Sequence, residues 1–485
     1  MAASYSMDRI SQREFRSNDS YEEGNVQKIN ASQPEYISKH DIAIFEQFHE
    51  ALKDGRLGDL IDEKDIKLVN RKTKIGEGGF GNILDVKVKD NKNVNVNIVA
   101  KVPVDYGKKL TKDRVAKINK NVLGEQRKAN NLRREIKKAI VNGDLANAQA
   151  LNNVVVPFKV FQVGENGLKA LLMRKADGND GIKAINDGKI EGYSRGISLK
   201  EEELDNKKSD SCKLKKYHYV DDRKVALSIA RQKAMLLRGL HECGYVNIDT
   251  KLENVMISKN GVVSMIDVGS IVKVGEKDDF AFSYTKETVA PEVLNDGYEA
   301  HPKSDVFSDA VDRPYILFGQ VADKYFGRKS HNNFGSLKMD ATFVKNGLKE
   351  YKKLGFDLPK FPENFTNAQK ARYIYYHLGF KKIQKELVDT IKENAKTRQQ
   401  VKKAEIVEKD IYPDEVLHSL ALLQTYATDP DPRFRISDRE VEEILLNLEM
   451  TSDLWNSGQF RVKDRHITLY SLVDEILPKN RKKEK

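Results

Sequence analysis

The sequence has little of several features that would assign it to a class of protein at once. Cys212 and Cys243 are the only cysteines in 485 residues, which argues for a reducing compartment and leaves no cysteine spacing typical of a metal site. It has no uninterrupted apolar run of about 18 residues, so we expect no membrane span. The first residues, MAASYSMDRISQREFRS, contain no apolar segment, so no cleavable secretory signal is predicted. These absences favour a cytoplasmic protein.

Lysine and arginine outnumber the acidic residues, 84 to 73, which gives a formal net charge of +11. The positive side chains are scattered along the chain and are not interleaved with aromatic residues. This pattern is typical of solvated faces that also attract an anionic cofactor, so we expect no specific nucleic-acid site. The chain is long enough to contain more than one domain or lobe.

Four stretches of different character follow one another along the chain. Residues 1–40 are polar and lack an apolar period, which predicts a mobile tail. Residues 41–66 have apolar side chains at helical spacing and are expected to form a helical extension. Residues 67–178 are rich in strand patterns and enclose one basic helical stretch, whereas residues 179–485 are mainly helical after a polar segment near 180–220.

The segment IGEGGFGNI contains Gly76, Gly78 and Gly81 in the spacing GxGxxG between two strand-like runs. Glycines let the backbone approach phosphate oxygens, to which bare amides can donate. The alternative is a tight glycine hairpin without a ligand. A dinucleotide fold would need the glycines to open a helix, whereas NILDVKVKD continues as a strand pattern.

Lys101 ends the alternating strand pattern IVAKV. A lysine at a strand end is usually just exposed, and it gains a role only if an acid holds its ammonium over a triphosphate. Glu135, in the helical pattern LRREIKKAI, is the best candidate for that acid, and Glu125 is the runner-up.

The segment YVNIDTKLENVMIS places Asp249, Lys251 and Asn254 between two apolar runs. Asp249 could accept a proton from an attacking hydroxyl, and Lys251 could neutralise a phosphoryl group. The amide oxygen of Asn254 could bind a metal ion. Asp267, in MIDVGS, follows an apolar strand pattern and offers a hard carboxylate oxygen suited to Mg²⁺. A single loop acid is more often a turn residue, so the order and spacing of the set carry this interpretation.

These motifs, in this order, resemble the eukaryotic-type protein kinase family of the Ser/Thr kind. The resemblance runs from about residue 70 to 445 and extends to later segments that resemble the end of the activation segment, the start of a large helix and a late Arg motif: TKETVAPE, KSDVFS and DPRFRIS. It implies an α+β, bilobal protein-kinase-like fold. The expected division is a small lobe and hinge at 67–178 and a helical large lobe at 179–485, with insertions near 180–220 and 320–410.

The resemblance implies ATP and Mg²⁺ as cofactors and a role for each motif residue. Asp249 is the expected catalytic base and Lys251 its electrostatic helper, while Asn254 and Asp267 hold Mg²⁺. Lys101 binds the α- and β-phosphates and pairs with Glu135. The remaining expected contacts are the glycines over the phosphates, Ile83 and Val99 above the adenine, Met256 below it, Met173 at the back of the site and a hinge from Arg174 to Ala176. Glu292 with Arg435, and Asp305, are expected to be structural.

The sequence also departs from the family pattern. The usual His-Arg before the catalytic Asp is Asn247-Ile248, and Ile248 cannot grip a phosphate. We therefore expect activity without phosphorylation of Ser283, Tyr284 or Thr285. Val268 replaces the usual Phe after Asp267, which could loosen that motif. Thr285 falls where Ser/Thr kinases carry a threonine near the catalytic Asp, although it could be an ordinary loop residue.

The insertions suggest a divergent kinase with a protein substrate and special partners. The charged run at 380–410 could be a solvated arm or a docking surface, and its charges favour the arm. Similar divergence in a Lys/Asn-rich chain is found in kinase-like effectors that bacteria deliver into host cells. The alternative functions are a pseudokinase-type binding or scaffolding module and a small-molecule phosphotransferase. Retention of Lys101, Asp249, Asn254 and Asp267 favours an active serine/threonine protein kinase.

Overall fold

The computed structural model describes most of the chain between residues 66 and 456. The described ranges are 66–68, 74–78, 81–88, 98–105, 108–142, 144–164, 166–191, 194–200, 214–220, 222–277, 284–295, 297–326, 338–393 and 412–456. The predicted tail at 1–40 and nearly all of the helical extension lie outside them. Ile66, the last residue given to that extension, instead begins strand β1.

The described residues form two compact units, each of which is considered by itself. The N-terminal unit runs to Asp177 and also includes Gly239–Asn247 and Ser264–Val272. The C-terminal unit comprises Gly178–Arg238, Ile248–Val263 and the residues from Lys273 onward. The chain therefore returns twice to the N-terminal unit, and the second return carries Asp267.

An antiparallel sheet organises the N-terminal unit, with strand order β1-β3-β4-β6-β5 and β2 paired to β3. Its strands are β1 (Ile66–Leu68), β2 (Lys74–Gly78), β3 (Gly81–Val88), β4 (Ile98–Val102), β5 (Lys159–Val163) and β6 (Leu168–Arg174). Successive side chains of a strand point to opposite faces. In β4, Ile98, Ala100 and Val102 accordingly pack in one apolar cluster and Val99 in another. This alternation places Lys101 on the same face as Val99.

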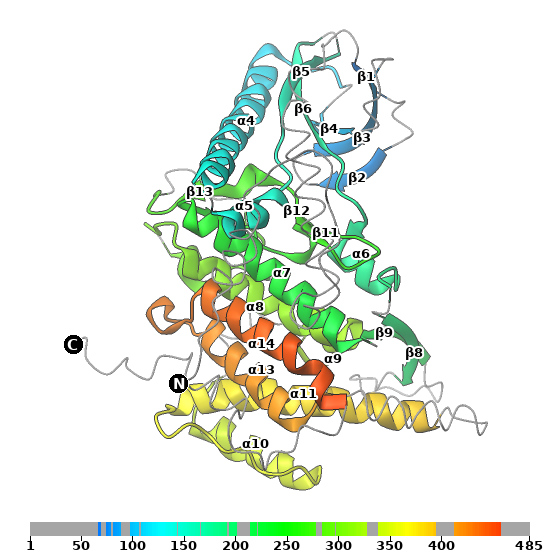
Figure 1. The fold of residues 1–485 in the computed structure, drawn as a ribbon, viewed down its shortest axis with the longest axis vertical. Coiled ribbons are helices and arrows are strands. Elements are labelled where there is room, and N and C mark those ends of the chain that lie inside the picture. The colour runs from blue at the N-terminus through cyan, green and yellow to red at the C-terminus, as the bar shows by residue number, and fades with distance from the viewer. Residues whose placement is uncertain are drawn as a thin grey trace, which may run out of the picture. The chain divides into compact units, whose positions relative to one another are not determined.

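Helix α4 (Lys112–Val141) packs against this sheet, and Figure 1 shows it lying beside β5 and β6. Val115, Ile118 and Val122 recur at helical spacing and contact the apolar clusters of the sheet. Helix α5 (Leu145–Asn152) follows, capped by the Asp144 carboxylate, which accepts from the Asn147 amide at 3.1 Å. The positions of these apolar residues on α4 determine which polar residues of the helix can face the sheet.

The C-terminal unit is mainly helical. Its elements are β7 (Asn179–Asp180), α6 (Gly181–Asn186), β8 (Ser194–Lys200), β9 (Leu214–Val220), β11 (Val255–Ile257), α8 (Pro302–Phe318), α9 (Asp323–Phe326), α10 (Ala341–Lys353), α11 (Asn367–Glu393), α13 (Asp414–Ala427) and α14 (Asp438–Asn456). Helix α7 (Arg223–Glu242) begins in this unit and ends in the other, and β10 (Tyr245–Asn247), β12 (Val263–Met265) and β13 (Ile271–Lys273) lie near the boundaries.

Helix α8 is the core of the C-terminal unit, since every residue from Ser304 to Phe318 is buried. His301 caps its start by accepting from the Lys303 amide at 3.1 Å. The buried ammonium of Lys233 pairs with Asp312 at 3.1 Å, which compensates an otherwise costly buried charge. Helices α13 and α14 pack against α8.

The two predicted insertions are partly described. The first contains α6 and the antiparallel hairpin β8–β9, where only a polar segment was expected. The second contributes α10 and α11, whereas 327–337 and 394–411 lie outside the described residues. Among the helices in the described part of the chain, none is both long and apolar enough to cross a membrane.

Candidate active site

The predicted glycine loop is a strand hairpin in the N-terminal unit. Gly76 and Gly78 lie in β2, and Gly78 is the register partner of Gly81 at the start of β3. A Cβ on Gly81 would stand 2.9 Å from the Val102 carbonyl oxygen and 3.1 Å from Cγ of Lys101. Glycine is therefore required for β3 to pass so close to the lysine. The hairpin continues as a strand, as the sequence predicts, and opens no helix.

Lys101 is the centre of a charged cluster in the same unit. Its ammonium donates to both carboxylate oxygens of Glu125, at 3.0 and 3.1 Å, and to Oδ1 of Asp267 at 2.8 Å. The side chains of Lys101 and Glu125 are only 11% and 12% exposed. The ion pair therefore lies where charges are poorly screened and strongly oriented.

The predicted partner of Lys101 was wrong. Glu135 forms an ion pair with Lys138 at 2.7 Å, one turn along α4, and takes no part in the cluster. Glu125, the runner-up, is the acid that contacts Lys101. Ten residues correspond to about 15 Å along a helix axis, so the two acids cannot exchange roles without moving the helix.

Burial and charge act in opposite directions on this cluster. Burial tends to lower the pKa of Lys101, but the nearby carboxylates Glu125 and Asp267 outweigh it and raise the pKa above its ordinary value. Burial raises the pKa of Glu125 in spite of Lys101, and Asp267 adds to the rise. One ammonium against two carboxylates leaves the contacting groups with a net charge of −1, which favours a further cation.

Asp267 is held in an unusual backbone conformation. It is the only described residue other than glycine with a positive φ, 67°, a region that carries a steric cost for residues with a Cβ. Its Oδ1 also accepts from the Gly269 amide at 3.1 Å. The strained turn therefore aims the carboxylate at Lys101.

Apolar residues predicted to contact an adenine gather beside this cluster. Val99 and Met173 are register partners in β4 and β6 and pack in one cluster with Ile83 and Ala176. Arg174 ends β6, and its guanidinium donates to the Asn152 carbonyl at 3.3 Å. Met256 belongs to the C-terminal unit, where β11 pairs Met256 with Asp180 of β7.

In the C-terminal unit, Asp249, Lys251, Asn254 and Thr285 form a compact polar network. The Thr285 hydroxyl donates to Asp249 Oδ1 at 2.7 Å and accepts from the Lys251 ammonium at 2.6 Å. Lys251 also pairs with Asp249 Oδ2 at 2.9 Å. Asp249, at 6% exposed, is thus fixed by donors on both carboxylate oxygens.

Asn254 completes this network through its amide nitrogen. That nitrogen donates to the Asp249 carbonyl at 2.8 Å and to Asp249 Oδ2 at 2.9 Å. Both acceptors are oxygens, so the amide nitrogen of Asn254 is the atom that faces Asp249. The amide oxygen of Asn254 takes part in neither bond. That oxygen is the atom that a magnesium ion would bind.

The positions that depart from the family pattern are buried. Asn247 is 1% exposed and donates to Sδ of Met265 at 3.4 Å. Ile248 is 3% exposed and Val268 is 1% exposed. Tyr284 and Thr285 are described, whereas Ser283 lies outside the described residues. The buried, apolar side chain of Ile248 offers no donor to a phosphate.

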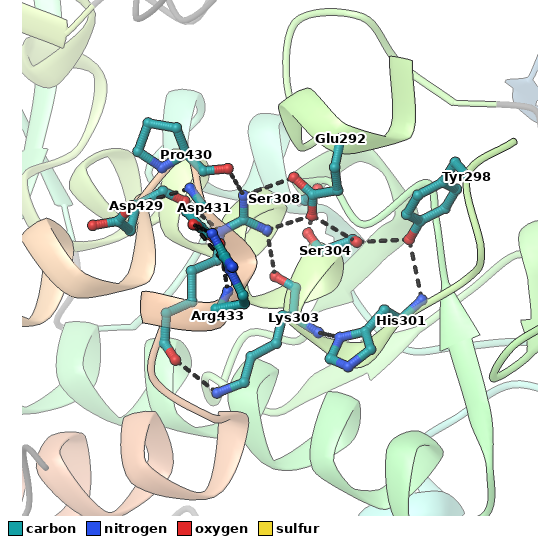
Figure 2. Close-up of polar contacts among 11 residues, drawn as sticks. Glu292, Tyr298, His301, Lys303, Ser304, Ser308, Asp429, Pro430, Asp431 and Arg433 are labelled. Carbon is teal, nitrogen blue, oxygen red and sulfur yellow. Dashed lines mark hydrogen bonds and ion pairs between the residues drawn. The ribbon is translucent and has the colours of Figure 1, made fainter. Parts of the chain in front are cut away.

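The predicted structural pair is present in the C-terminal unit. Arg435 is fully buried and contacts both carboxylate oxygens of Glu292, at 2.5 and 2.7 Å. It also donates to the carbonyls of Lys303 and Pro430, at 3.0 and 3.1 Å. Figure 2 labels Glu292, Lys303 and Pro430 among the polar contacts of this region. Removing one partner of such a buried pair costs roughly 3–5 kcal/mol. Asp305 is likewise fully buried, at the start of α8.

Sequence reasoning missed Lys128. Its ammonium donates to the Gly269 carbonyl at 2.7 Å, so α4 contacts the Asp267 turn as well as Lys101. Lys128 lies three residues after Glu125, a spacing that puts both side chains on one helix face. That spacing is the signal that could have found it once Glu125 was chosen.

Comparison with known proteins finds similarity to protein kinases. Residues 198–357 match the family model described as a protein kinase domain. A Dictyostelium discoideum protein named "Probable serine/threonine-protein kinase" is 36% identical over 87 residues, which are 18% of this chain and 9% of that protein. The chain therefore matches less than a tenth of that relative's length. The α+β fold expected from the sequence is confirmed, and these matches support the resemblance to the eukaryotic-type protein kinase family.

Proposed function

We propose that the chain transfers the γ-phosphate of ATP to Ser or Thr hydroxyls of protein substrates. The observation that carries the proposal is the network around Asp249. A nearly buried carboxylate is held by a hydroxyl, an ammonium and an amide, as a group that must accept a proton in one orientation requires.

In the proposed reaction a substrate oxygen forms a bond to the γ-phosphorus, and the bond from that phosphorus to the bridging oxygen of ADP breaks. The hydroxyl proton passes to Asp249, and ADP leaves with the bonding electron pair. Lys251 stabilises the negative charge of the transferring group, and Thr285 keeps Asp249 and Lys251 in register. Lys101, fixed by Glu125, binds the nucleotide phosphates.

The residues present suit a magnesium ion bound with the nucleotide. Asp267 would offer a carboxylate oxygen and Asn254 its amide oxygen, and the ion would shield phosphate charge. Among the described residues, no three His, Cys, Asp or Glu side chains form a metal centre by themselves. This agrees with an ion held partly by phosphate oxygens, as Mg²⁺ in phosphotransfer sites is.

Transfer of labelled γ-phosphate to generic protein substrates and to the chain itself tests the proposal. Asp249→Asn and Asp267→Ala are expected to lower the rate of transfer about 100-fold or more while the protein stays folded. Retained transfer in both variants would overturn the residue assignments. Tight ATP binding without transfer by the parent chain would favour a pseudokinase-type binding module.

We further propose that this transfer needs no phosphate on the activation segment. This proposal is supported by Ile248, which is buried and stands where the family pattern has an arginine that binds a phosphate. Phosphatase treatment is expected to leave the initial rate unchanged. A loss of activity that tracks phosphate at Ser283, Tyr284 or Thr285 would contradict this proposal.

We also propose that a partner protein docks at the second insertion, of which α10 and α11 are described.

A further inference from the structure

Helix α4 makes two polar contacts with functional segments of the N-terminal unit. Glu125 holds the ammonium of Lys101, and Lys128 donates to the backbone carbonyl of Gly269 at 2.7 Å. Gly269 lies two residues after Asp267, in the short 3-10 turn Val268–Ser270. One face of one helix therefore fixes both the phosphate-binding lysine and the turn that carries the metal-binding acid.

Both backbone polar groups of Gly269 are occupied. Its amide donates to Asp267 Oδ1 at 3.1 Å, and its carbonyl accepts from Lys128. A Cβ at this position would stand 3.0 Å from Asp267 Oδ1 and 3.5 Å from Glu125 Oε2. The turn is therefore packed tightly against the carboxylates of the site, and a small displacement of Gly269 would move Asp267.

The side chain that follows Asp267 can make fewer packing contacts than an aromatic side chain would. Val268 is buried, at 1% exposed, but it is smaller than the aromatic residue that the family pattern has there. A smaller side chain makes fewer dispersion contacts. The hydrogen bond from Lys128 supplies a directional contact to the same turn, and its donor is charged, which makes it one of the stronger kinds.

We propose that Lys128 is a positioning residue that holds the Asp267 turn in its metal-binding arrangement in place of the missing aromatic anchor. The inference rests on the proposed function and names how its metal-nucleotide site is kept in order. Because Glu125 lies on the same helix face, a displacement of α4 would release Lys101 and the Asp267 turn together.

Hydrogen exchange in the absence of nucleotide tests the contact without any assay of activity. Lys128→Met keeps the chain length and removes the donor. It is expected to speed exchange in the segment 266–272 about tenfold, as loss of one charge-assisted hydrogen bond predicts. Lys128→Arg is expected to restore protection. Arg127→Met, at the exposed neighbouring position, is the matched control and should leave exchange unchanged.

A second measurement addresses the metal. The rise in melting temperature caused by ADP is titrated with Mg²⁺, and Lys128→Met is expected to need a several-fold higher concentration for half the effect. Unchanged exchange at 266–272, or an equal change in Arg127→Met, would overturn the proposal. If Lys128→Met does not fold, Lys128→Leu, which also lacks a donor, replaces it in both measurements. Absence of transfer by the parent chain would instead refute the proposed function. The two failures can be told apart because hydrogen exchange is measured without catalysis.

Discussion

Two polar clusters, each with a lysine that contacts an aspartate, differ in their balance of charge. In the N-terminal unit, Lys101 faces the two carboxylates of Glu125 and Asp267. In the C-terminal unit, Lys251 faces one carboxylate, Asp249, with the Thr285 hydroxyl between them. The first cluster is left with excess negative charge, whereas the second is balanced and centred on a neutral group.

This difference matches two different tasks. Excess negative charge beside a buried lysine suits a place where a divalent cation and phosphates arrive together, since each neutralises the other. A balanced network suits a carboxylate that must keep its orientation and accept one proton, because no net field pulls it away. The first three predictions below each change one cluster while leaving the other intact.

The largest expected effect comes from the balanced cluster. Asp249→Asn keeps the size of the side chain and removes its ability to accept a proton. We expect kcat to fall roughly 10²–10⁴-fold, the range for loss of a general base, while the affinity for magnesium-ATP is unchanged. Steady-state kinetics and nucleotide titration measure the two quantities. An equal loss of nucleotide affinity would show that the clusters do not divide the work in this way.

The charged cluster is tested by its acid. Glu125→Gln removes the ion pair with Lys101 and is expected to lower kcat/KM for ATP about 10–100-fold, as loss of a charge-assisted hydrogen bond predicts. Glu135→Gln is the matched control on the same helix. Its partner Lys138 is exposed, and such a surface pair is worth about 0–1 kcal/mol. A larger effect of Glu135→Gln would show that Glu135, and not Glu125, supports Lys101.

The hydroxyl between Asp249 and Lys251 sharpens the comparison. Thr285→Val keeps the shape and removes the donor and acceptor, so kcat is expected to fall about tenfold. Thr285→Ser keeps the hydroxyl and should retain most of the activity. Rates of both variants at saturating ATP decide the point. If valine and serine behave alike, the hydroxyl does not organise this cluster.

The last prediction concerns acid stability, which must be separated from titration of either cluster. The Tyr351 hydroxyl bonds His377 Nδ1, and the Tyr373 hydroxyl bonds His418 Nδ1, each at 2.6 Å. Burial lowers the pKa of His377 to about 3 and that of His418 to about 4. Both histidines therefore stay neutral in the folded chain at pH values where they would be protonated in the unfolded chain.

Because the folded pKa values lie below the ordinary value of 6.5, the stability from these groups is complete above that pH. It is lost progressively as the pH falls toward 4, by about 1.4 kcal/mol per pH unit for each histidine. Urea unfolding between pH 7 and 4 measures the slope. The double variant Tyr351→Phe with His377→Phe should remove the share of the slope that comes from His377, and an unchanged slope would assign acid sensitivity to other groups.

Much of the site was predictable because it depends on short spacings. Asp249, Lys251 and Asn254 lie within six residues, so one loop necessarily keeps them together. The glycine hairpin and Lys101 likewise follow from strand patterns that pair locally. The bonds from Thr285 could not be derived in this way, because they join residues more than thirty positions apart.

The choice between Glu125 and Glu135 required tertiary information. Both acids lie in a continuous helical pattern, and the sequence alone does not say which turn meets the sheet. In the structure, Val115, Ile118 and Val122 contact the sheet, and Glu125 continues their spacing. The strands of the hairpin β8–β9 were missed because their polar composition hid a pattern that only pairing reveals.

The left-handed backbone of Asp267, with φ at 67°, also has a pharmacological consequence. Such a conformation costs about 1 kcal/mol or more relative to an extended one, and contacts with Lys101 and Gly269 sustain it. A small molecule that captures a relaxed form of this turn would relieve that strain but lose those contacts, so the free-energy difference between the two forms lowers its apparent affinity. An inhibitor directed at the relaxed turn must therefore supply contacts that replace those with Lys101 and Gly269.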